Sequence, residues 1–277
     1  IEASAGYGKN GWQGAFWRAG KAAKNFKHDE VLPLFTQKSI DFIKDAAQDP
    51  KPFFLYLALA SPHTPWLASE PFKGSSEIGE WGDWVAEKDH AIGKVIDAVY
   101  ESGLKENTLI ILTSDNGPVW WPIDIETYGH RSTSHYRGMK FDAWEGGHRM
   151  PFIASWPGTV AQGSQSDRIV SNTDMLATFA DLLGAALPED AGVDSYSFLD
   201  ALYQKEGSKP TREVIVGRPE YIRKGDWKLI GEDQLYNLVT DPSEENDVYE
   251  NNKDIASELR ALLEQYKTEG RSTPKPE

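Results

Sequence analysis

The chain has 277 residues, no cysteine, 43 acidic and 29 basic side chains, and a formal charge of −14 at pH 7. The absence of cysteine excludes disulfide scaffolds, cysteine-ligated zinc or iron–sulfur sites and an encoded cysteine nucleophile. The acidic balance argues against nucleic acid as a partner, because a negative surface repels phosphate. No apolar run approaches the about 18 residues of a membrane helix, so the chain is predicted to be globular and not to act in a membrane.

Helices and apolar segments alternate in the first part of the chain. Residues 1–30 show no hydrophobic period and are predicted to be a loop, whereas apolar spacing predicts helices over 34–47 and 83–102. The apolar runs 53–60 and 108–113 have the length of strands that are buried on both faces. This alternation predicts an α/β fold, in which helices flank a mixed, largely parallel sheet.

A long connection follows the second apolar run. Residues 119–149 are rich in tryptophan and histidine, and we expect an ordered loop there, because loops of this length in compact domains are usually functional. The apolar segment 150–158 then returns to the sheet. Helical spacing of apolar residues predicts a further helix over 172–184.

The last part of the chain has a different character. The charged, Pro- and Gly-containing segment 205–213 separates a predicted α/β domain over 1–207 from a small α+β subdomain over 208–277. Short segments with turn residues between them predict an antiparallel sheet in this subdomain. A helix over 253–267 is expected to pack on the sheet, and the tail after it is expected to fray.

Polar residues follow both apolar runs of the first part. His63 stands between two prolines in the turn SPHTPW, and Asp115–Asn116 directly follows the second run. Ligands of α/β sheets gather beyond the carboxyl ends of strands, so these residues are candidates for one site. A carboxylate beside an amide oxygen suits Ca²⁺ or Mg²⁺, although Asp-Asn-Gly is also ordinary turn chemistry.

The connection over 128–149 is positively charged within an acidic chain. It holds four basic and two acidic side chains, a net +2, and three of the six histidines. Its Lys140 lies among aromatic residues and close to a glycine pair. A cationic loop of this kind would concentrate an anionic ligand; the alternative is that its charges pair internally or face water.

Five segments, taken together and in order, resemble the sulfatase family of the alkaline phosphatase superfamily. The block around Lys140 is the most specific of them. The segments are SPHTPW, EKDHAIGKVIDAVYESGLKENTLIILTSDNGP, GMKFDAWEGGHRMPFIASWPG, SNTDMLATFADLLG and LYNLVTDPSEENDV.

The resemblance implies a sulfuric ester hydrolase of the arylsulfatase type that acts on a small sulfated ester or saccharide. Asp115 and Asn116 would ligate a divalent cation, Ca²⁺ with Mg²⁺ as the alternative. Lys140 and His63 would bind the sulfate ester and neutralise or protonate the leaving oxygen. Residues outside the family motifs are our own candidates for reading the alcohol part of the substrate: Trp120, Trp121, His130, His135, Arg137, Trp144 and His148.

The chain departs from the family pattern at the nucleophile. Family members carry an N-terminal aspartate pair and then a Cys- or Ser-x-Pro/Ala-x-Arg segment, whose first residue becomes formylglycine. The nearest match here, Ser164-Gln-Ser-Asp-Arg168, lacks Pro or Ala and follows Lys140, in the wrong order. We therefore read the chain as the family sequence from mid-domain onward, with 1–207 as a partial catalytic domain that has little or no activity alone.

This interpretation carries further expectations. Missing strands would leave sheet edges uncovered, so a complementing N-terminal polypeptide or a homodimer is expected. The resemblance implies a periplasmic, secreted or lysosomal protein. Two alternative functions stay open: a phosphodiesterase or phosphonate hydrolase of the same superfamily, and a non-catalytic fragment that binds anions or sugars.

Overall fold

The computed structural model describes residues 27–204 and 212–274. They form two compact units, one within Ile1–Thr108 and one within Leu109–Glu277, and each is described by itself. Residues 1–26 of the loop predicted over 1–30, and most of the boundary segment predicted at 205–213, lie outside the described residues. The division at 207/208 stays a prediction about a subdomain within the second unit.

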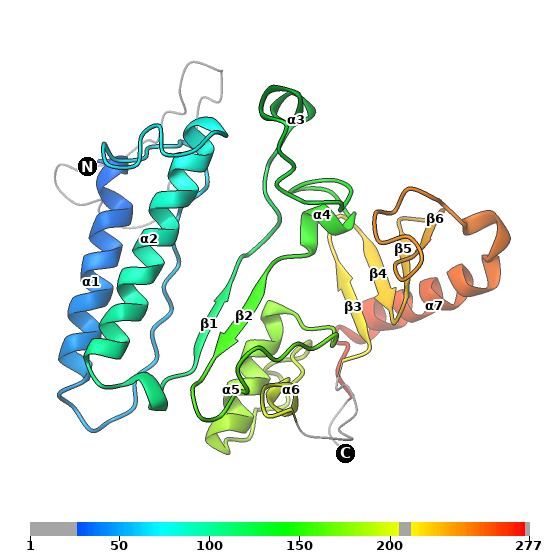
Figure 1. Ribbon diagram of the computed structural model, residues 1–277. Helices are drawn as coiled ribbons and strands as arrows, with labels where there is room; N and C mark the ends of the chain where they lie inside the picture. The colour runs from blue at the N-terminus through cyan, green and yellow to red at the C-terminus, as the bar shows by residue number, and fades with distance from the viewer. Residues whose placement is uncertain (1–26, 205–211, 275–277) are drawn as a thin grey trace. The chain divides into compact units, whose positions relative to one another are not determined.

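The first unit is built on two packed helices. After a short 3₁₀ turn, His28–Glu30, helix α1 (Val31–Ala46) packs against α2 (Gly79–Glu101), and a second 3₁₀ turn, Lys105–Asn107, ends the unit. The two helices lie side by side in Figure 1. Both predicted helices are confirmed, each starting three or four residues earlier than the hydrophobic period indicated. The α1 start includes Pro33, which the first turn of a helix tolerates.

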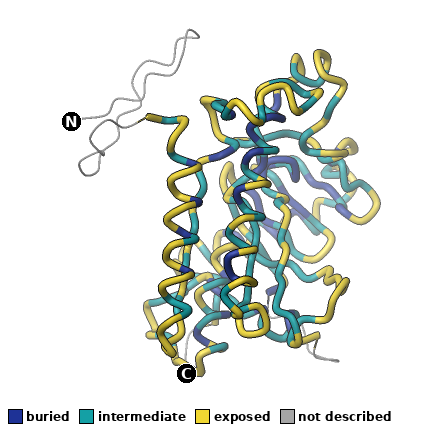
Figure 2. Tube along the Cα trace, turned by 60° about the vertical axis from the view of Figure 1, so that its left-hand side comes forward, coloured by how far each residue is buried: buried dark blue, intermediate teal, exposed yellow. Residues whose placement is uncertain are grey.

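Helix α1 buries a narrow stripe. Its buried residues are Leu32, Thr36, Ser39 and Ile43, a spacing of four, three and four that keeps them on one face. Helices in Figure 2 show the same alternation, with short buried segments between exposed ones. Leu32 belongs to a cluster with Trp84 and Ala91 of α2, so the amphipathic pattern is what joins the two helices.

The prediction of a strand over 53–60 is wrong. The segment has no strand ladder with any described residue, and its burial alternates, so that Phe54 is 71% and Tyr56 80% exposed. Phe53 packs edge-on against Phe42 of α1, with ring centroids 5.6 Å apart. A strand needs a hydrogen-bonded neighbour, and here the apolar run has one packed face and one open face instead of two buried ones.

The second unit begins with a two-stranded ladder. Strand β1 (Ile110–Thr113) pairs antiparallel with β2 (Phe152–Ser155), so that Thr113 faces Phe152. Both strands were predicted, and within the predicted mixed sheet this pair is antiparallel. Because the strands run in opposite directions, the connection between them leaves and returns at the same end of the ladder. The candidate residues after β1 and those before β2 are therefore brought to one place.

The connection predicted as a loop over 119–149 contains two short helices. Helix α3 (Pro122–Tyr128) begins with a proline at its first position, where no backbone N–H is needed. Helix α4 (Glu145–His148) spans one turn. Neither is long enough to show a hydrophobic period in the sequence.

A third helical region follows β2. The 3₁₀ turn Asn172–Asp174 leads into α5 (Met175–Leu183), as predicted, and α6 (Leu199–Leu202) follows. Asp174 is buried and receives two donors of Arg212, Nε at 2.9 Å and Nη2 at 2.6 Å. This ion pair ties the start of α5 to the residues just before the C-terminal sheet.

The C-terminal part is a four-stranded antiparallel sheet with a helix across it, as predicted. The strands follow chain order: β3 (Val214–Gly217), β4 (Tyr221–Lys224), β5 (Trp227–Ile230) and β6 (Gln234–Asn237). Strand β4 was not predicted, because two of its four residues are charged. After the 3₁₀ turn Tyr249–Asn251, α7 (Lys253–Glu269) covers the sheet.

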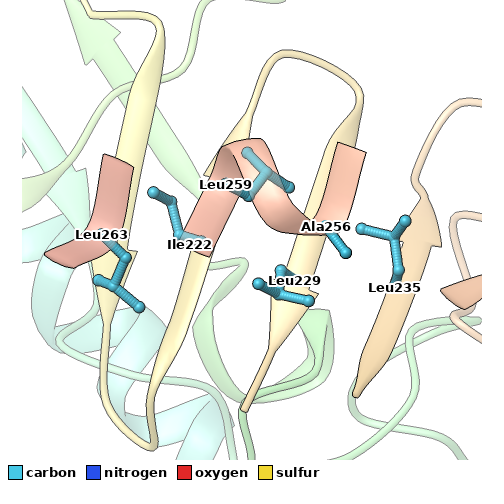
Figure 3. Packing of buried hydrophobic residues seen from close by; sticks show 6 residues of the cluster. All are labelled: Ile222, Leu229, Leu235, Ala256, Leu259 and Leu263. Carbon is cyan, nitrogen blue, oxygen red and sulfur yellow. The ribbon is translucent and has the colours of Figure 1, made fainter. Parts of the chain in front are cut away.

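One face of this sheet forms a core with α7. Figure 3 shows three sheet residues, Ile222, Leu229 and Leu235, packed with Ala256, Leu259 and Leu263 of the helix. The tail does not fray at its start: Ser272 N donates to Asp194 Oδ1 at 2.8 Å, and Thr273 Oγ1 donates to the Val193 carbonyl at 2.8 Å. These bonds hold the start of the tail against residues 193–194 of the same unit.

We expect Leu235→Ala to lower the free energy of unfolding by about 2–5 kcal/mol, because Leu235 is fully buried and its removal leaves a cavity. Val239→Ala is the matched control; Val239 is 69% exposed, and its change should stay within about 0.5 kcal/mol. Urea denaturation followed by circular dichroism measures both. Equal losses in the two variants would contradict the assigned core.

Candidate functional site

The Asp115–Asn116 turn and the Lys140 segment are joined through their backbones. Lys140 N donates to the Pro118 carbonyl at 2.8 Å, and Gly117 N donates to the Gly147 carbonyl at 2.9 Å. These two bonds connect residues that are more than twenty positions apart in the sequence. The predicted metal ligands and the predicted sulfate-binding lysine therefore belong to one structural element.

Three glycines allow this close approach. A Cβ on Gly117 would lie 1.9 Å from the Gly146 carbonyl oxygen, one on Gly146 would lie 2.4 Å from the Gly138 carbonyl oxygen, and one on Gly147 would lie 2.3 Å from the Asp142 carbonyl oxygen. Each distance is far below van der Waals contact, so any side chain would force the backbones apart. The glycine pair noted beside Lys140 thus has a steric purpose.

The chemistry-bearing side chains of this element remain available. Asp115 is exposed, and Lys140 is half-buried; within 27–204 and 212–274 no ion pair engages either one. The Lys140 ammonium lies 5.5 Å from the centre of the Phe141 ring. Asn116 Nδ2 donates to the Gly117 carbonyl at 2.9 Å, which leaves its amide oxygen free of that bond.

The donor types fit a hard divalent cation. Asp115 offers a carboxylate and Asn116 an amide oxygen, and both are ligands that Ca²⁺ and Mg²⁺ accept. Calcium takes about six to eight oxygens. The described residues contain no cluster of three or more His, Asp or Glu side chains placed to hold a metal, so a calcium ion bound by this pair would need further oxygen ligands.

His63 lies in the first unit, and its contacts are local. Its Nδ1 is 2.7 Å from the Thr64 carbonyl oxygen. Because a carbonyl oxygen only accepts, Nδ1 carries the proton and Nε2 is left to bind or transfer one. Trp84 Nε1 donates to the His63 carbonyl at 3.3 Å, which ties the turn to α2.

The residues predicted to contact the alcohol part of the substrate differ in their exposure. Trp120 is only 5% exposed and its Nε1 donates to the His130 carbonyl at 2.8 Å, so it packs the interior of the connection. Trp121, by contrast, is 52% exposed at the start of α3. His135 is exposed and its ring stacks on Tyr136 with centroids 4.1 Å apart.

The remaining three candidates face the C-terminal sheet. The Arg137 guanidinium lies 3.9 Å from the centre of the Trp144 ring, and its Nη1 donates to the Glu244 carbonyl at 2.8 Å. The ring of His148 stacks on Tyr221 at 4.6 Å. Burial, together with the nearby Lys228 charge, lowers the pKa of His148, so this imidazole is neutral at pH 7. These positions favour a structural role for all three.

A buried ion cluster was not predicted from the sequence. Lys228 of β5 is fully buried, and its ammonium lies 2.9 Å from a carboxylate oxygen of Glu145 and 2.9 Å from one of Glu244. Glu145 N also donates to Glu244 Oε2 at 2.5 Å. We call these three residues the Lys228 cluster. In the sequence, the only indication of this cluster is Lys228 itself, a charged residue within the apolar strand WKLI.

The two carboxylates of the Lys228 cluster differ in their electrostatics. Burial raises the pKa of Glu145, but Lys228 and the arginines at 149 and 223 outweigh it, and the net pKa is lowered. At Glu244 burial prevails over Lys228, and the pKa is raised. Burial and the Glu145 charge raise the pKa of Tyr221 to about 12, so its hydroxyl stays protonated.

The Lys228 cluster connects the Lys140 segment to the C-terminal part of the chain. Glu145 opens α4, five residues after Lys140, and α4 contains both glycines that contact the Asp115 turn. Lys228 and Glu244 belong to the C-terminal part, 83 and 99 residues away in sequence. The small sheet therefore holds the Lys140 segment in place.

Comparison with known proteins gives the family. The family model described as "Sulfatase" matches residues 4–185, which include all of the predicted site residues but not Lys228 and Glu244. The chain belongs to the sulfatase family. A second model, described as the C-terminal part of N-sulphoglucosamine sulphohydrolase, matches residues 139–269 of this sulfatase chain.

Relatives and solved structures agree with this assignment. An N-acetylgalactosamine-6-O-sulfatase of Bacteroides thetaiotaomicron is 35% identical over 283 aligned residues, covering 91% of this chain and 54% of the relative. A solved structure from work on glycosaminoglycan metabolism by the same organism matches with a TM-score of 0.81 at 34% identity, covering 88% of this chain and 55% of that one. The alkaline-phosphatase-like sulfatase fold is thereby confirmed.

A third match carries a ligand. A structure solved in complex with its substrate, D-glucosamine-2-N,6-O-disulfate, has a TM-score of 0.52 and 26% identity, and covers 68% of this chain and 40% of that one. This sulfatase chain spans about half the length of the first two relatives. None of its described helices is long and apolar enough to cross a bilayer.

We expect Lys228→Met to lower the free energy of unfolding by about 3–5 kcal/mol, because two buried carboxylates lose their cation. The matched control is Lys224→Met on β4, whose partner Glu258 is exposed; exposed pairs contribute about 0–1 kcal/mol. Urea denaturation at pH 7 compares them. A loss no larger in Lys228→Met than in the control would refute the role of the cluster.

The lowered pKa of Glu145 gives a pH dependence. Its stabilising contribution is present above the unfolded value of 4.5 and is lost as pH falls through the lower folded value. The destabilisation caused by Glu145→Gln should therefore be largest at pH 7 and shrink below pH 4.5. Urea denaturation from pH 7 downward tests this, with Glu250→Gln, at an exposed ion pair, as a control expected to show little change.

Proposed function

We propose that this chain supplies part of the active site of a sulfate-monoester hydrolase that acts on a sulfated saccharide. The single observation that supports this most is the backbone junction of the Asp115–Asn116 turn with the Lys140 segment. It places a hard-cation ligand pair and an ammonium group in one element of a sulfatase-family chain. The ammonium group, and a cation held by the Asp115–Asn116 pair, would both attract the monoanionic sulfate ester.

In the proposed mechanism Lys140 binds the sulfate oxygens and neutralises the charge that develops on them. His63 would act here as an imidazolium: its Nδ1–H donates to the Thr64 carbonyl, and its Nε2–H would donate to the ester or pass its proton to the leaving oxygen. Asp115 and Asn116 would hold the metal, for which we propose Ca²⁺, with Mg²⁺ as the alternative. The metal would supply Lewis-acid stabilisation of the sulfate group.

The nucleophile is not among the chain's recognisable residues. Sulfatases generally use formylglycine, whereas this chain encodes no cysteine, and its Ser164–Arg168 segment lacks the Pro or Ala of the family motif. We therefore propose that the chain alone binds sulfate esters and turns them over slowly or not at all. A complementing polypeptide would then have to supply the nucleophile, whereas a second copy encodes the same residues and would only cover exposed sheet edges.

The substrate class follows from the relatives. One acts, by its name, on N-acetylgalactosamine 6-sulfate groups, and another was solved with a sulfated glucosamine. A sulfated amino sugar is therefore our proposed ligand, with the exposed Trp121 and His135 as contacts to it. On the same family relation we propose a periplasmic, secreted or lysosomal location, and the division of the chain at 207/208 into catalytic part and subdomain.

We expect Lys140→Ala to weaken binding of N-acetylgalactosamine 6-sulfate by about 10- to 100-fold, the range for a lost hydrogen bond between charged groups. Calorimetry in Ca²⁺ measures the affinity, and Lys224→Ala, remote from the site, serves as the control and should bind like the original chain. Undiminished binding by Lys140→Ala would contradict the proposal.

The same samples separate the alternative functions. N-acetylgalactosamine 6-phosphate should bind more weakly than the 6-sulfate; the reverse order would favour the phosphodiesterase or phosphonate-hydrolase reading. An assay of the chain on 4-nitrophenyl sulfate at high protein concentration should show little hydrolysis. Metal-dependent hydrolysis that disappears in Lys140→Ala would overturn the claim that the nucleophile is absent, while binding without turnover would agree with the binding-fragment reading for the isolated chain.

A further inference from the structure

Phe141, which follows Lys140, combines two unfavourable features. Among the described residues, four other than glycine have a positive φ: Ser134, Phe141, Gln204 and Glu244. Phe141 is the only large apolar one, at φ 84°, a conformation that side chains with a Cβ rarely adopt. Its ring is also 68% exposed. Neither feature benefits folding.

The surrounding backbone explains the conformation but not the phenylalanine. Asp142 N donates to the Met139 carbonyl at 3.0 Å, and Met139 N donates to Asp142 Oδ2 at 2.9 Å. With the Lys140–Pro118 bond, these contacts close a tight turn that determines the φ of residue 141. Glycine would adopt this φ without strain, so the bulky ring is not required by the turn.

The position of the ring indicates what it contacts. The Lys140 ammonium lies 5.5 Å from the ring centre, so an anion bound by Lys140 would lie within reach of the ring. The group attached to that anion through its ester oxygen is the alcohol part of the substrate. A pyranose presents a C–H face of carbon-bound hydrogens, and an aromatic ring buries such a face well. Strained residues that persist against folding cluster at ligand sites.

We propose that Phe141 is a specificity-determining residue whose ring packs on the C–H face of the sugar that carries the sulfate bound by Lys140. The inference rests on the proposed function, since it needs Lys140 to bind the sulfate group. It assigns Phe141 to the sugar and not to the anion. Ligands with the same charged group but no sugar should therefore be insensitive to the ring.

The test uses four variants of the full chain and two ligands in Ca²⁺ buffer. Methyl sulfate has the anion alone, and N-acetylgalactosamine 6-sulfate has the anion and the sugar; ligand-observed NMR titration measures both affinities. Phe141→Gly removes the ring and also relieves the strain of the positive φ. Phe141→Ala removes the ring and leaves that strain in place, and Phe141→Tyr preserves an aromatic ring. Leu183→Ala removes another exposed apolar side chain, 75% exposed at the end of α5.

The expected pattern separates the ring from the backbone. Phe141→Gly and Phe141→Ala should weaken the sugar sulfate about tenfold and change methyl sulfate by less than about twofold, whereas Phe141→Tyr restores binding of the sugar sulfate. Phe141→Gly should melt no lower than the original chain, because glycine relieves the positive φ. Leu183→Ala should leave both affinities unchanged.

Three results would overturn the inference in distinguishable ways. Equal affinity for the sugar sulfate in the original chain and Phe141→Gly would show that the ring does not contact the sugar. A parallel loss of melting temperature and of both affinities would make Phe141 a structural residue. Binding of neither ligand by the original chain would refute the proposed function, and the assignment of Phe141 with it.

Discussion

The arrangement of the second unit depends on one buried lysine shared by two glutamates. Lys228 reaches Glu145 at the start of α4 and Glu244 beyond β6, at 2.9 Å each. Without this cation the two carboxylates would be buried close together, which is strongly unfavourable. The C-terminal sheet and the connection between β1 and β2 can therefore adopt their observed arrangement only together, and the Lys140 segment takes its position from that arrangement.

Buried charges of this kind contribute more to geometry than to stability, because desolvation offsets much of their attraction. Here the geometry is supported from a second side. Gly117, beside Asp115 and Asn116, lies so close to Gly146 of α4 that a side chain on Gly117 would not fit, and two backbone hydrogen bonds close the contact between the turn and the Lys140 segment. The candidate site is thus held between the Lys228 cluster and the β1 turn, while the side chains of Asp115 and Lys140 stay available to a ligand.

The sequence predicted the long elements well and the pairings poorly. Helices α1, α2, α5 and α7 follow from apolar spacing, which is a local property. The apolar run at 53–60 was misjudged, because a strand exists only through a partner elsewhere in the chain, and β4 was missed because charges hide its pattern. The Lys228 cluster joins residues 83 and 99 positions apart, a distance over which no sequence period extends.

By itself, the sequence determined the chemical inventory: no cysteine, an Asp–Asn pair after a strand, a lysine in an aromatic and glycine-rich segment, and motifs that place the chain among the sulfatases. The tertiary structure alone decided which of these groups lie close together and which are buried by packing. It joined Lys140 to the Asp115 turn, buried Trp120 and turned His148 toward Tyr221. The reason is physical: residue type sets what a side chain can do, but burial and neighbours, which arise only on folding, set whether it is free to do it.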